Sequence, residues 1–131
     1  MKYQAPSPRE GPGTGDPLFR DVCRAGLLPL MVLHYVAREP CYGNQLIDRI
    51  AWLTAGTVAV NPNTMYPLLR SLEARGLIAG EWESPPDRGR RYYRITPDGN
   101  DERLRLAGRM APHLDAVAAS VEIIRTVLLE R

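Results

Sequence analysis

The sequence is short of lysine, of cysteine and of long apolar runs. The last two shortages each exclude a class of protein. Two cysteines, Cys23 and Cys41, are too few for a disulfide framework or a zinc site. No apolar run is long enough to cross a membrane, and no secretory signal pattern opens the chain. We therefore expect a cytoplasmic protein, with no membrane partner and with two ordinary thiols rather than a redox switch.

The motifs of catalysis are also missing. The sequence has no glycine-rich phosphate loop, no paired catalytic carboxylates, no His/Cys set with metal-ligand spacing and no nucleophile elbow. Asp98, Asp101 and Glu102 suit the cap of a helix better than an active site. These absences predict a protein that is not an enzyme and that holds neither a cofactor nor a metal.

The charge is weakly basic and is carried almost entirely by arginine. The formal net charge is +2 and the chain holds 17 Lys and Arg residues, of which only Lys2 is a lysine. Arginine makes planar, bidentate contacts to phosphate and to guanine, although genome composition would explain the preference equally well. At 131 residues the length fits one core rather than two independent ones.

The most informative stretch is 61–76, which predicts a helix with clear ends. Asn61 suits the N-cap, Pro62 suits the first helical position, and Gly76 suits the left-handed residue after the last turn. One apolar stripe recurs at helical spacing and is expected to face the core; it consists of Met65, Leu68, Leu69 and Leu72.

The other face of this helix is small or hydrogen-bonding rather than charged. It carries Asn63, Tyr66, Pro67, Arg70 and Ala74. Such a face fits the DNA major groove, where Arg70 or Asn63 would reach bases. Thr64 and Tyr66 would reach bases or phosphates. Pro67 should remove one backbone hydrogen bond and bend the start of the helix.

Three motifs in this order resemble the PadR family of transcriptional regulators. The segment 63–78 is similar to the recognition helix of that family, although the family often has glycine where Asn63 stands. The Tyr-Gly pair at 42–43 looks like an element of the family that precedes this helix, and 90–99 looks like its second wing strand with the turn that follows. The resemblance covers about 24–105 and implies a winged helix-turn-helix that dimerises through its C-terminal helix, in the smaller subtype.

Two further helices are expected before the recognition helix. The Pro- and Gly-rich stretch 1–17 is predicted to be a flexible tail, and 18–38 a helix that starts or bends at Pro29. The second helix, 42–54, begins at a Tyr-Gly pair. Because free N–H groups at a helix start suit a DNA phosphate, Tyr42 and Gln45 are candidate phosphate contacts, with simple capping as the alternative.

The segment 77–96 alternates apolar and polar residues around a Pro- and Gly-containing turn, which predicts a β-hairpin. Three arginines crowd the predicted tip and return strand, namely Arg88, Arg90 and Arg91. As the wing of a winged helix they would touch the DNA backbone or minor groove. A solvated charge cluster is the other interpretation.

The rest of the chain, 97–131, is predicted to be helical, with a kink or split near Ala111 caused by Pro112. A continuous apolar stripe exceeds what one small domain can bury, so we expect a homodimer. Folding back on its own domain is the alternative. The expected dimerisation residues are Leu28, Met110, Leu114, Val117, Val121, Ile124 and Leu128.

The sequence thus predicts a mostly α fold with a small β-hairpin wing (α+β). It has a tail (1–17), a winged helix-turn-helix domain (18–96) and a C-terminal dimerisation helix (97–131). The function hypothesis is a repressor that binds a palindromic operator in double-stranded DNA as a homodimer. The alternative is a winged-helix protein-interaction module that does not read DNA. The resemblance also implies a small planar aromatic effector, for which Trp52, Trp82 and Tyr93 would be linings unless they belong to the core.

Overall fold

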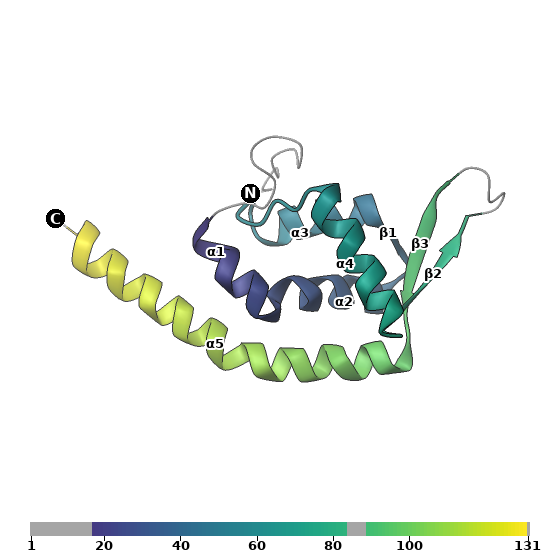
Figure 1. The fold of residues 1–131 in the computed structure, drawn as a ribbon. Helices are drawn as coiled ribbons and strands as arrows, with labels where there is room; N and C mark the ends of the chain where they lie inside the picture. The colour runs from purple at the N-terminus through teal and green to yellow at the C-terminus, as the bar shows by residue number, and fades with distance from the viewer. Residues whose placement is uncertain (1–16, 84–88, 131) are drawn as a thin grey trace.

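The computed structural model describes residues 17–83 and 89–130, so the predicted tail, apart from Pro17, and Arg88 lie outside the described residues. Figure 1 shows the earlier helices packed together, a small sheet at one end and a long last helix below them. This confirms the predicted mostly helical fold with a β-hairpin. The elements are α1 (Pro17–Val22), η1 (Cys23–Leu27), α2 (Leu28–Arg38), β1 (Cys41–Tyr42), α3 (Gly43–Leu53), α4 (Pro62–Ala74), β2 (Ile78–Trp82), β3 (Arg91–Ile95) and α5 (Pro97–Leu129).

Helix α2 forms the centre of the molecule. Val32 and Leu33 on it are completely buried, and the helix contacts α3, α5 and the sheet. Pro29 lies in its first turn, as predicted, because a residue without an N–H fits there at no cost. The sharp bend itself lies earlier, at Gly26, whose φ of 130° suits glycine alone.

Strand β1 was missed by the sequence analysis, which placed Tyr42 inside a helix. Cys41 and Tyr42 pair with Tyr93 and Tyr92 of β3, so the antiparallel sheet has the order β1-β3-β2. A two-residue strand gives no alternating pattern, and only its partner makes it visible. This strand ties the start of α3 to the wing.

The predicted hairpin is confirmed. β2 and β3 pair in a register that places Gly80 opposite Tyr93, and Ile78 and Tyr93 face the core. The connector between α3 and α4 also contributes to the core, through Val58 and Val60, which are almost fully buried. The sequence analysis treated that segment only as a spacer.

Helix α5 continues through Pro112, so it is not split there. Figure 1 shows the helix change direction about midway, which fits the kink that was the other form of the expectation. The start of α5 is capped by Thr96, whose hydroxyl accepts a hydrogen bond from the Gly99 N–H at 3.0 Å. Glu102 does not cap: its buried carboxylate pairs with Arg75 at 3.1 Å and with Arg105. This ion pair ties the end of α4 to α5.

The apolar stripe of α5 divides into two parts. Met110 is only 2% exposed and packs inside its own subunit, as Leu106 does. Leu114 and Val117 pack partly against the same core. Beyond them the helix leaves the domain, and Ile124 is 54% exposed. The N-terminal half therefore follows the fold-back alternative, and the C-terminal half is left uncovered.

Candidate nucleic-acid interface

The two faces of α4 are separated as the sequence predicted. Met65, Leu69 and Leu72 are buried, while the opposite face with Asn63 and Tyr66 is exposed. The Asn61 side chain caps the helix by accepting a hydrogen bond from the Thr64 N–H at 3.0 Å. The helix therefore presents a polar face that the core does not use.

Helix α4 continues through Pro67, which lies on the exposed side. Its missing N–H leaves the carbonyl of Asn63 without its usual helical partner. That carbonyl is next to an exposed Asn63 side chain, so the first turn offers a backbone acceptor as well as an amide.

Tyr66 stands directly over the start of α3. A side chain on Gly43 would have its Cβ 2.6 Å from Cε1 of the Tyr66 ring, which is too close for both groups to stay in place. Glycine at position 43 therefore permits this contact. The glycine of the Tyr-Gly pair has a physical reason here, because it makes room for the tyrosine of α4.

Tyr42 and Gln45 have partners within the protein. The Gln45 side chain accepts a hydrogen bond from the Tyr42 N–H at 2.9 Å, which caps α3. The Tyr42 hydroxyl donates to Glu83 at 2.9 Å, and this bond raises the pKa of the phenol. The Arg90 guanidinium lies 4.0 Å from the centre of the Tyr42 ring. Tyr42 thus ties the start of α3 to the wing, and Gln45 caps that start.

Each described arginine of the wing has an acidic partner. Arg91 donates to Glu73 on α4 at 2.6 Å and is half-buried. Arg90 lies 3.7 Å from Glu83. Arg94, which the sequence analysis did not single out, lies 3.0 Å from Glu81 on the neighbouring strand. The wing is therefore less positive than its arginine content suggests.

Arg91 acts as a brace between the wing and α4. Glu73 accepts hydrogen bonds both from Arg91 and from the Gly80 N–H, the latter at 3.0 Å. The same guanidinium donates to the Gly80 carbonyl at 3.2 Å. Because its guanidinium is already bonded to Glu73 and Gly80, Arg91 is better suited to positioning the wing than to contacting DNA.

Among the described residues Arg70 forms no ion pair, in contrast to the wing arginines, and its side chain is exposed. It lines a groove of about 430 Å³ between the start of α3, the face of α4 and the wing. The groove brings together the three sequence motifs. Its lining includes Tyr42, Asn44, Tyr66, Arg70, Trp82 and Arg90.

Two groove residues were missed as contacts. Asn44 is exposed at the start of α3. The only sequence signal for it was its place between Tyr42 and Gln45, the candidate phosphate contacts. Trp82 was expected to belong to the core, yet it is 55% exposed, and Trp52 is also exposed. Trp82 alternates with the buried Ile78, which predicts the same inward side of the strand. It is the last residue of β2, however, and lies beyond the buried core. Tyr93 is buried as expected.

Thr64 lies apart from this groove. It is half-buried and faces a second, mainly apolar cavity on the other side of α4. Of the predicted base-reading residues, Asn63, Tyr66 and Arg70 thus share the exposed face, and Thr64 does not.

Within the described ranges no helix is long and apolar enough to span a membrane. The same part of the chain holds no group of three His, Cys, Asp or Glu side chains placed to bind a metal ion. The two thiols are free, and burial raises the pKa of both Cys23 and Cys41. A raised pKa lowers the thiolate fraction and so disfavours a thiol-based sensor.

The winged fold and the exposed helix face define a class, the DNA-associated winged-helix regulators, and comparison narrows it. Residues 32–105 match the transcriptional regulator PadR-like family, and the chain belongs to that family. It is 39% identical over 74 residues to the transcriptional regulator Rv3488 of Mycobacterium tuberculosis. That match covers 53% of this chain and 63% of the relative, so the chain spans less than two thirds of that protein.

Solved structures agree with this assignment. A PadR family transcriptional regulator from Eggerthella lenta is 34% identical, with a TM-score of 0.63, over 77% of this chain and 87% of that one. A transcriptional regulator from Clostridium thermocellum has a TM-score of 0.61 over 85% of this chain and 97% of that one. At 22% identity it is similar in fold alone.

Proposed function

We propose that this protein is a cytoplasmic repressor that binds a palindromic operator in double-stranded DNA as a homodimer. The observation that carries the proposal is the exposed face of α4, with Asn63, Tyr66 and Arg70 beside the wing. Two such helices would enter successive major grooves about one helical turn apart. The family assignment supports a regulatory role.

The experiment is fluorescence anisotropy of the full chain against duplexes tiled across the promoter nearest its own gene, at two salt concentrations. Tight binding to one duplex, weakened by salt, is expected because phosphate contacts release counterions. Because Arg91 is paired with Glu73, we expect Arg70 to contribute more than Arg91 to the phosphate contacts and to the salt dependence. Uniformly weak binding to every duplex would contradict sequence-specific recognition.

Replacing Tyr66 by alanine should weaken operator binding at least about tenfold, the loss of one or two good contacts. The dimer should be unchanged, because Tyr66 lies away from α5. Tyr66→Phe is the matched control and separates the hydroxyl from the ring. Unchanged affinity of the alanine variant would remove Tyr66 from the contact surface.

Gly43→Ala should lower operator affinity about fivefold to tenfold without unfolding the protein, because the new Cβ displaces the Tyr66 ring rather than backbone. The sharper test is a double-mutant cycle. In a Tyr66→Ala background the Gly43→Ala change should have almost no effect on affinity. Equal losses in both backgrounds would show that Gly43 acts independently of Tyr66.

The alternative function, a protein-interaction module that does not read DNA, is favoured by one observation. The described wing arginines are paired with Glu73, Glu81 and Glu83, and this pairing reduces the free positive charge in the described part of the wing, which suits a protein partner. Absence of DNA binding even at low salt would support it.

A planar aromatic effector at the dimer seam has little support from the expected aromatic linings. Tyr93 is buried in the core and Trp82 lines the groove beside α4. Tryptophan fluorescence on titration with diverse aromatic compounds tests it, and a flat response would count against such a pocket.

A further inference from the structure

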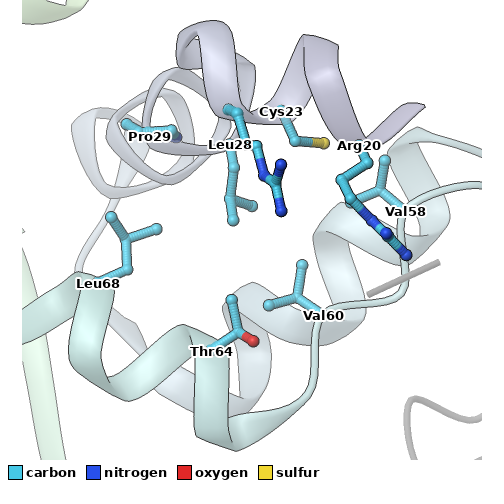
Figure 2. A pocket seen from close by; sticks show the side chains of 9 residues that line it. Arg20, Cys23, Leu28, Pro29, Val58, Val60, Thr64 and Leu68 are labelled. Atoms are coloured by element: carbon cyan, nitrogen blue, oxygen red, sulfur yellow. The ribbon is translucent and has the colours of Figure 1, made fainter. Parts of the chain in front are cut away.

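A cavity of about 500 Å³ lies between the N-terminal helices and the first half of α4. Figure 2 shows Leu28 and Pro29 on one side of it, with Val60, Thr64 and Leu68 on the other. Small-molecule sites have volumes of roughly 300–1,000 Å³, so this cavity is large enough for a ligand. It is separate from the groove beside the wing.

The apolar part of the lining is aliphatic. Leucine, valine and proline side chains form it, and none of the described lining residues is aromatic. Among these described residues a ring would find no aromatic partner to stack on, whereas an alkyl chain would pack against such walls. The cavity therefore differs in chemistry from the expected site for a planar aromatic compound.

The polar part of the lining is positive. Arg20 on α1 and Arg24 on η1 stand about one helical turn apart, and neither forms an ion pair with any described residue. Figure 2 shows the Arg20 side chain at the edge of the cavity, where it extends past Val58. Two guanidinium groups beside an apolar cavity suit an anionic head with an apolar tail, because a carboxylate accepts charge-assisted hydrogen bonds from both.

We propose that this cavity binds an aliphatic monocarboxylate. The carboxylate lies between Arg20 and Arg24, and the alkyl chain lies against Leu28, Val60 and Leu68. The thiol of Cys23 and the hydroxyl of Thr64 flank the ligand.

The position of the cavity couples it to the candidate DNA-binding helix. Thr64 and Leu68 belong to α4, and Val58 and Val60 belong to the connector that sets its angle. A bound carboxylate also neutralises positive charge beside the first turn of α4. Ligand binding should therefore lower operator affinity, and DNA should lower ligand affinity by the same factor. This regulatory consequence rests on the proposed function, whereas ligand binding does not.

The test of the site is isothermal titration of the full chain, without DNA, with sodium decanoate. Saturable binding is expected, with decanol and the planar acid cinnamate binding more weakly. The Arg20→Gln/Arg24→Gln variant should lose about tenfold in decanoate affinity, since it removes two charged hydrogen bonds. Arg38→Gln is the matched control, because Arg38 is an exposed arginine outside the cavity lining.

Cys23 gives a second readout that reports position. Its thiol is half-buried at the cavity wall, whereas Cys41 is fully buried elsewhere and serves as the internal reference. Decanoate should slow alkylation of Cys23 by iodoacetamide and leave that of Cys41 unchanged, as followed by mass spectrometry. Unfolding of a variant would instead raise the alkylation of both cysteines.

Three titration results would overturn the proposal. They are the absence of saturable decanoate binding, equal affinity in the Arg20→Gln/Arg24→Gln variant, and tighter binding of cinnamate than of decanoate. Full protection of Cys23 in the ligand-free protein would also overturn it, because the partner chain would then occupy the cavity. If decanoate binds but does not change the anisotropy of a bound operator, the proposed regulation is contradicted and the proposed ligand site still stands. Failure of the chain to bind any duplex would instead contradict the proposed function.

Discussion

Replacing Gly99 by alanine is expected to destabilise the protein by about 3 kcal/mol or more, the upper end of the cost of overpacking. A Cβ at this position would lie 2.8 Å from the carbonyl carbon of Leu77, and closer still to its oxygen. These are backbone atoms, so no side chain can turn aside to make room. Gly99 lies where the first turn of α5 touches the start of the wing, so the damage would spread to both.

Thermal unfolding at one fixed chain concentration measures the effect, and a fall in Tm of roughly 10 °C is expected. Gly108→Ala is the matched control in the same helix, because nothing lies within 4 Å of the Cβ it would add. That change should leave the protein equally stable or raise its stability by about 0.5–1 kcal/mol, the helix preference of alanine over glycine. Similar Tm values for both variants would show that α5 approaches Leu77 less closely.

Ile124→Glu is expected to weaken the proposed dimer by about a hundredfold or more, because it places an unpaired charge in an apolar contact. Ile124 is 54% exposed in the single chain. It lies on one stripe with Val121 and Leu128, at the alternating spacing of three and four that a helix pair uses. The exposed ends of two α5 helices would cover one another.

Sedimentation velocity over a range of concentrations measures this effect. Thr126→Glu adds the same charge two residues further on, off the stripe, and should leave the association constant unchanged. The Ile124→Glu variant should also bind a full operator more weakly, since each chain then holds one half-site alone. A wild-type protein that sediments as a monomer at all concentrations would refute the dimer.

The positions of the elements follow from local signals. Asn61, Pro62 and Gly76 mark the ends of α4 in the sequence, and the structure caps that helix at Asn61 and turns at Gly76 with φ of 74°. Caps and apolar periodicity act within a few residues, so one chain segment contains the whole signal. The hairpin and the exposed face of α4 could be predicted for the same reason.

The electrostatics of the candidate site could not be predicted in this way. Arg91 and Glu73 are 18 residues apart, and they meet only because β3 pairs with β2 in one register and the wing then folds against α4. Three arginines near a turn looked like a phosphate contact. The fold turns at least two of them, Arg90 and Arg91, towards acidic partners.

What the sequence by itself determined is the order of the main helices and of the hairpin strands, their approximate ends, the family and the polar face of α4. These depend on the spacing of side chains along one segment. Only the tertiary structure decided that Met110 is buried while Ile124 is exposed, that Tyr66 stands over Gly43, and that two arginines border an aliphatic cavity. Such features join distant segments, and their geometry is set by how helices and strands pack rather than by any local pattern.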